Sequence, residues 1–182
     1  MGRLRFNDHG RGSLLTITAM TSPAPKKFDL IVIGGGSAGH AAARTGAALG
    51  LSCALVEAPG PLGGLCILRG CMPSKVLLET SNRMREIHEA KRFGITAAEP
   101  KLNLAALRAR LEELTKDFRD YRLQEMESSG YQLIRATASF TSAHELSLLD
   151  ENGGTSTASA KAFVIATGSF PPLPKIPRLE GT

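Results

Sequence analysis

A glycine-rich loop that follows a short apolar run constrains the fold more than any other feature of this sequence. Residues 28–33 read FDLIVI, and the next six read GGGSAG, so that Gly34, Gly36 and Gly39 form the pattern G-x-G-x-x-G. A short, mainly apolar run of this kind is typical of a strand that is buried on both faces. The loop therefore begins where a buried strand ends.

The segments after the loop complete a βαβ unit. The alanine-rich stretch 41–49 stops at Gly50, as helices often do, and residues 51–57 read LSCALVE, a second strand that closes on Glu57. Two parallel strands joined by a helix predict a right-handed crossover.

The pattern predicts a dinucleotide site rather than a glycine turn that is merely structural. Gly34 permits the tight turn, Gly36 lets phosphate approach the backbone, and Gly39 lets the helix pack on the strand. Ser37 and Ala38 complete the loop at the helix N-terminus, whose free N–H groups favour an anion. Glu57 follows Gly34 by 23 residues, where a carboxylate can bind ribose hydroxyls.

The middle of the chain predicts two helices and then strands. Pro73 suits the first turn of a helix that runs to about Lys91, and residues 103–129 predict another helix. Apolar side chains recur along this second helix at spacings of three and four: Leu104, Leu107, Leu111, Leu114, Phe118 and Tyr121. An intramolecular helix pair explains so short a seam better than a dimeric coiled coil.

The remaining segments predict a small β-structure. YQLIRATASF at 131–140 and HELSLL at 144–149 are expected as strands, and ENGG at 151–154 as the turn after them. KAFVIATGS at 161–169 is expected as another buried strand that runs into a glycine. The proline-rich end of the chain is expected to be extended.

Two of the three cysteines lie in the segment GGLCILRGCMPSK, residues 63–75. Cys53, inside the second strand, is expected to pack as a small apolar residue. The four histidines are scattered, so we expect no zinc site and no other metal. Idle thiols remain an alternative, but the surroundings suit redox work: Cys71 lies just before a helix start, where the dipole favours a thiolate, and Lys75 adds positive charge.

These motifs together resemble the flavoprotein disulfide reductases, the class I pyridine nucleotide-disulfide oxidoreductases. GGGSAG with its acid, the two-cysteine segment and ATGS at 166–169 match in order and spacing over about residues 28–180. Ser74 before Lys75 is most like the dihydrolipoyl dehydrogenase and mercuric reductase branches. Leu65 stands where the family usually has Thr, and Leu68-Arg69 stand where it usually has Asn-Val.

The resemblance implies an FAD site and a redox-active disulfide between Cys66 and Cys71. Cys66 would exchange with the substrate, and Cys71 would form the thiolate beside the flavin. Electrons would pass between NAD(P)H, FAD, the disulfide and a small-molecule dithiol, disulfide or lipoyl-domain substrate. The residues expected to bind the cofactor are Gly34, Gly36, Ser37, Ala38, Gly39, Glu57, Gly64, Leu65, Cys66, Lys75, Ala138, Ala166, Thr167 and Gly168.

The predicted fold is α/β: a Rossmann-like FAD-binding domain with a parallel central sheet, an inserted antiparallel helix pair and a small β-meander. This domain is assigned to residues 28–182. The sequence has no second glycine fingerprint and no His-Pro pair, both of which the family carries. We therefore expect a truncated member that is inactive alone, whose parent is a homodimer. The alternative is a stand-alone FAD-binding module or a remnant without turnover.

Residues 1–27 are expected to be a disordered basic extension. They hold five basic residues against one acidic residue, a net charge of +4 that leaves only +1 of the total +5 for the rest of the chain. The body therefore lacks the basic face that nucleic-acid binding needs, and no apolar run is long enough to span a membrane. The expected location is cytoplasmic, and the alternative is mitochondrial, with residues 1–27 as a transit peptide. An upstream start, with Met20 as the natural one, is the alternative to a disordered extension.

Overall fold

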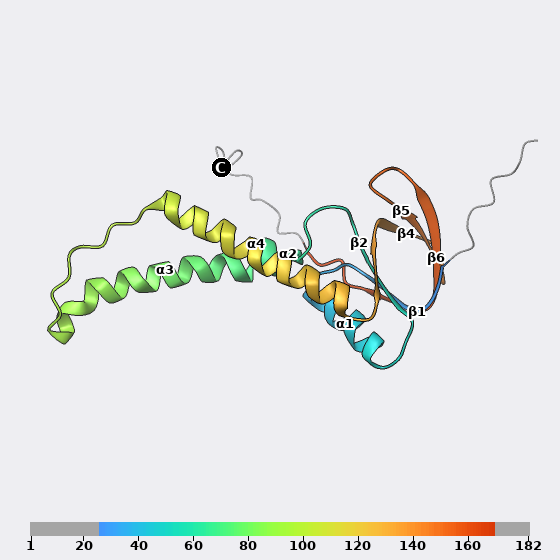
Figure 1. The fold of residues 1–182 in the computed structure, drawn as a ribbon, viewed down its shortest axis with the longest axis horizontal. Coiled ribbons are helices and arrows are strands. Elements are labelled where there is room, and N and C mark those ends of the chain that lie inside the picture. The colour runs from blue at the N-terminus through green and yellow to red at the C-terminus, as the bar shows by residue number, and fades with distance from the viewer. Residues whose placement is uncertain (1–25, 170–182) are drawn as a thin grey trace, which may run out of the picture.

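A computed structural model describes residues 26–169 of the chain, and its centre is a six-stranded sheet in the order β3-β2-β1-β6-β5-β4 (Figure 1). Three neighbouring strands of this sheet are β1 (Lys26–Ile33), β2 (Cys53–Glu57) and β6 (Thr155–Ile165). β1 pairs in parallel with both β2 and β6, and α1 (Ser37–Ala48) crosses from β1 to β2. The predicted βαβ unit is confirmed.

The sheet curls back on itself because its two edge strands are consecutive in the chain. β3 (Gln132–Arg135) pairs in parallel with β2, whereas β4 (Thr137–Ser142) lies at the opposite end of the strand order. β5 (Glu145–Leu149) pairs antiparallel with both β4 and β6. β6 is eleven residues long, and it joins this β-meander to the parallel strands.

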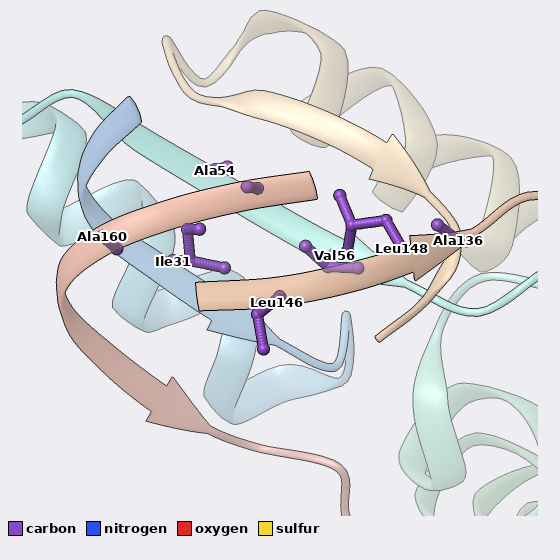
Figure 2. Packing of buried hydrophobic residues seen from close by; sticks show 8 residues of the cluster. Ile31, Ala54, Val56, Ala136, Leu146, Leu148 and Ala160 are labelled. Atoms are coloured by element: carbon purple, nitrogen blue, oxygen red, sulfur yellow. The ribbon is translucent and has the colours of Figure 1, made fainter. Parts of the chain in front are cut away.

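Alternate residues of the parallel strands face two separate cores. The first core lies between the parallel strands and the β-meander, and Figure 2 shows its side chains gathered from both. The second lies on the other side of the sheet, beneath α1 and the end of α4 (Leu104–Ser128). The first core comprises Ile31, Ala54, Val56, Ala136, Leu146, Leu148, Ala158 and Ala160. The second comprises Val32, Ala43, Cys53, Leu55, Leu62, Met126 and Tyr131.

The inserted helices form an antiparallel pair that extends away from the sheet (Figure 1). α2 (Gly64–Leu68) is followed by α3 (Cys71–Glu89) and a 3-10 helix (Ala90–Phe93), and α4 packs against α3 on its return. The predicted helix pair is confirmed, and Pro73 lies in the first turn of α3 as expected. None of the helices in residues 26–169 combines the length and the apolar character needed to cross a membrane.

The structure corrects three expectations about the elements. Residues 131–140 are not one strand, because the chain turns at the buried Ala136, whose N–H donates to the carbonyl oxygen of Glu57 at 3.0 Å. Lys26 and Lys27 belong to β1 and not to an extension, because their backbones pair with β6 while their side chains stay exposed. Residues 1–25 and 170–182, with the expectations placed on them, lie outside the described residues.

The third correction concerns the apolar seam of α4. Leu107, Leu111 and Leu114 are half-buried, but Leu104 and Tyr121 at the ends of the predicted seam are 70% and 60% exposed. The fully buried residue of this helix is Met126, which the seam did not include. The sheet, and not the partner helix, therefore provides the tightest packing for α4.

Replacing Gly39 with alanine tests the packing of α1 on β1. The added Cβ would lie 1.7 Å from the carbonyl oxygen of Gly34, so the loop and the helix must move apart. We expect a loss of about 1–3 kcal/mol in the free energy of unfolding, the usual cost of overpacking, measured by urea denaturation.

Gly36→Ala in the same loop is the matched control. Gly36 has a φ of −67°, and an added Cβ would meet nothing nearer than the Gly64 Cα at 3.8 Å. We expect this variant to keep nearly all of its stability. Equal losses in the two variants would contradict the packing role of Gly39.

Candidate functional site

The glycine loop and the end of β6 touch through their backbones. Gly34 has a φ of +104°, and a Cβ there would lie 2.3 Å from the carbonyl oxygen of Ala166. The Ala166 N–H donates to the carbonyl oxygen of Ile33 at 2.8 Å. The loop after β1 and the segment 166–168 after β6 therefore lie side by side at the carboxyl ends of parallel strands, where such sheets bind ligands.

Glu57 points into the loop. It ends β2, and its Oε2 accepts a hydrogen bond of 2.5 Å from the Gly35 N–H. A carboxylate has two oxygens and can accept several hydrogen bonds, so this contact fixes the side chain while leaving capacity for a ligand hydroxyl. Glu57 therefore faces the glycine loop, and its binding of ribose hydroxyls stays a prediction.

Two cavities flank the contact between the loop and segment 166–168. One, of about 270 Å³, is lined by Gly34, Glu57, Ala138 and Thr167 among others. The other, of about 310 Å³, brings together residues from all three motifs: Gly36, Ser37, Ala38, Leu65, Cys66, Gly70, Cys71, Ala166, Gly168 and Ser169. The glycine loop, the cysteine segment and the end of β6 are thus parts of one surface.

A second close glycine contact, between Gly64 and Gly36, packs the cysteine segment against the dinucleotide-type loop. Gly64 has a φ of +62°, and a Cβ there would lie 2.7 Å from the Gly36 Cα. No other residue type allows this approach without a shift of backbone. The contact places the start of α2, and Cys66 within it, against the N-terminus of α1.

Not every predicted residue lines these cavities. Gly39 packs under the loop, and Gly64 lines a smaller hollow of about 150 Å³ with Leu65 and Arg69. Lys75 is exposed, one turn beyond the start of α3. Its predicted contact with a flavin stays a prediction.

The two cysteines are free thiols that line the same cavity. Cys66 is half-buried in α2, and Cys71 is the first residue of α3 and more exposed. The hydrogen bond with the Cys71 thiol and then burial raise the pKa of Cys66, while the Cys71 backbone N–H and the charge of Lys75 act in the opposite direction. Since Cys71 is the more exposed thiol, the exchanging role of Cys66 rests on the resemblance alone.

Sequence reasoning missed a buried polar cluster beside the loop. His40, on the first turn of α1, is 5% exposed, and its Nδ1 lies 2.9 Å from the hydroxyl oxygen of Tyr131. Its Nε2 lies 3.7 Å from Glu125 Oε2, which also pairs with Arg122 Nε at 3.3 Å. The one available signal was a histidine between Gly39 and the alanine run 41–43.

The sequence of the chain matches known proteins. The family model described as pyridine nucleotide-disulphide oxidoreductase matches residues 28–182. A mercuric reductase of Streptomyces lividans is 36% identical over 155 residues, which cover 84% of this chain and 32% of the relative. A mitochondrial dihydrolipoyl dehydrogenase of Schizosaccharomyces pombe is 37% identical over 145 residues, which cover 79% of this chain and 28% of the relative. A glutathione reductase of Schizosaccharomyces pombe is 34% identical over 166 residues, which cover 87% of this chain and 35% of the relative.

A Rossmann-like domain with a dinucleotide-type loop and an adjoining cysteine pair defines an α/β redox flavoprotein class. The chain belongs to the pyridine nucleotide-disulphide oxidoreductase family, whose members bind FAD and NAD(P). The loop of Gly34 and Gly36, with Glu57 turned toward it, fits FAD. The chain spans about a third of the length of the curated relatives that it matches.

Replacing Cys71 with alanine removes the partner that contributes most to the raised pKa of Cys66. We expect the pKa of Cys66 to fall, so that its alkylation by iodoacetamide begins at a lower pH, because the thiolate is the reactive form. The measurement is the alkylation rate of the Cys66 peptide against pH under reducing conditions. Cys53, 5% exposed, is the internal control and should react equally slowly in both proteins. A Cys66 curve that stays in place or moves to higher pH would contradict the role of the thiol–thiol hydrogen bond.

Proposed function

We propose that this chain is the N-terminal FAD-binding part of an FAD-dependent dithiol–disulfide oxidoreductase. The observation that carries the proposal is the cavity of about 310 Å³ that the glycine loop and both cysteines line together. A dinucleotide-type loop alone would support any nucleotide-binding protein. A redox pair on the wall of the same cavity supports electron exchange between a bound flavin and thiols.

Each part of the site has a role that its geometry supports. The N-terminus of α1 has no side-chain cap and no acidic residue in its first turn, so its N–H groups suit a pyrophosphate. Glu57 would accept hydrogen bonds from ribose hydroxyls. Ala138, Thr167 and Gly168 would present backbone to the cofactor. When bound, FAD would supply two-electron transfer between a nicotinamide and the cysteine pair.

The cysteine pair would carry out thiol–disulfide exchange with a dithiol substrate. Starting from a Cys66–Cys71 disulfide, a substrate thiolate would attack the Cys66 sulfur, and Cys71 would leave as a thiolate. The second substrate thiol would then attack the mixed disulfide and release Cys66. The substrate would lose two electrons and become a disulfide, and the pair would gain those electrons as a dithiol.

The wider properties of the parent protein are part of the same proposal. The matched relatives include dihydrolipoyl and glutathione enzymes by name, so we assign a small dithiol or disulfide, or a lipoyl domain, as the substrate class. A homodimeric parent is our expectation from the family resemblance. A mitochondrial and a chloroplastic protein are among the relatives, and we keep the cytoplasmic location with the mitochondrial alternative.

An anaerobic half-reaction tests the proposal. The chain is loaded with FAD, its cysteine pair is oxidised, and dihydrolipoamide is added while the flavin absorbance is followed. We expect the flavin to be bleached by the dithiol, and Cys66→Ser to slow this bleaching at least a hundredfold because the exchange pair is broken. Cys53→Ser is the matched control and should react as the unchanged chain does.

Bleaching at the same rate in Cys66→Ser would contradict the proposed electron route. Failure of the chain to bind FAD would contradict the FAD-binding role itself. Steady oxidation of NADH with lipoamide by the 182-residue chain is not expected, because its sequence has one glycine fingerprint and no His-Pro pair.

A further inference from the structure

The polar cluster beneath the glycine loop joins three elements at one imidazole. His40 comes directly after Gly39 on the first turn of α1, and Tyr131 comes directly before β3. The two rings meet edge to face with centroids 6.2 Å apart, in addition to the hydrogen bond of 2.9 Å. Glu125 brings in the last turns of α4. His40, on the first turn of α1, is therefore in contact with Tyr131 on one side and with Glu125 of α4 on the other.

The groups that face His40 favour its neutral form. Burial lowers the pKa of His40 first, and the positive charges of Arg122 and Arg44 lower it further, while Glu125 acts in the opposite direction. Glu125 is already paired with Arg122, which reduces its support for a second cation. Burial also raises the pKa of Tyr131 to about 12, so the hydroxyl stays protonated near neutrality.

Two features connect the polar cluster around His40 to the candidate cofactor site. The first turn of α1, which carries His40, also carries Ser37 and Ala38 on the wall of the larger site cavity. α4, which carries Glu125, also packs against α2 and α3, the helices that hold the two cysteines. Packed elements thus connect the imidazole to the glycine loop on one side and to the cysteine helices on the other.

We propose that His40 is a positioning residue for the cofactor site: its neutral imidazole holds the first turn of α1 against Tyr131 and α4, and its protonation weakens FAD binding. This inference rests on the FAD-binding role proposed above. The sign follows from the environment of the ring. The unfolded imidazole takes up a proton near pH 6.5, whereas the folded one does so at lower pH. The contribution of the neutral imidazole to folding stability is complete above about pH 6.5 and is lost as the pH falls through the folded-state pKa. FAD binding weakens over the same range, because a protonated His40 no longer holds the first turn of α1 against Tyr131.

The test is the dissociation constant for FAD, measured by flavin fluorescence between pH 5 and 7.5 on the full chain. The unchanged chain should bind FAD more weakly as the pH falls. Tyr131→Phe removes the hydroxyl and should weaken binding about tenfold at pH 7.5, which corresponds to the loss of one buried hydrogen bond. His40→Asn places an amide near the position of Nδ1 and cannot titrate, so it should keep its affinity at pH 7.5 and lose the acid weakening.

His88→Asn is the matched control, because His88 lies on α3 with its side chain 62% exposed. This variant should keep the affinity and the pH profile of the unchanged chain. The inference is overturned if His40→Asn weakens at acid pH as the unchanged chain does, if Tyr131→Phe binds FAD normally, or if the unchanged chain shows no acid weakening. Absence of FAD binding in the unchanged chain would overturn the FAD-binding role, and this inference with it.

Discussion

The fold depends on close backbone contacts at the carboxyl ends of the parallel strands. Gly34 lies against Ala166, Gly39 lies against Gly34, and Gly64 lies against Gly36, each too close for a side chain. These contacts bring together segments far apart in the sequence: the loop after β1, the end of β6 and the start of the cysteine segment. A side chain in place of Gly34, Gly39 or Gly64 would force the two backbone segments apart. The fold and the candidate site therefore both require glycine at these positions.

The helix pair extends this arrangement beyond the sheet. α4 packs on the second core through the buried Met126, and it also contacts the two helices that carry the cysteines. The position of the thiols relative to the glycine loop is therefore set twice, directly by the Gly36–Gly64 contact and indirectly through α4. His40 and Tyr131 complete this indirect connection, because their hydrogen bond and the contact of His40 with Glu125 join the first turn of α1 to α4.

Local pattern predicted the elements well and their three-dimensional junctions less well. The buried run before Gly34, the glycine stop after α1 and Pro73 at the start of α3 carry their signals within a few residues. The break at Ala136 carries no such signal, since alanine fits a strand and only the curled sheet requires a turn there. The prediction of the apolar seam of α4 was wrong at both ends of the seam, because periodicity does not show how far along α4 the surface of α3 extends.

The site followed the same rule. The glycines, Glu57 and the cysteines were identifiable because their chemistry needs fixed residue types at fixed spacing. His40 and Tyr131 are 91 residues apart and meet only through the fold, so no spacing could pair them.

The shared cavity makes the dinucleotide-type loop and the cysteine pair one site. The most direct measurement is the rate at which iodoacetamide alkylates Cys71 in the reduced chain, with and without saturating FAD, followed peptide by peptide. We expect FAD to slow the alkylation of Cys71, which lines the shared cavity, and to leave the rate at the buried Cys53 unchanged. Equal rates at Cys71 in the free and the FAD-bound chain would contradict this expectation.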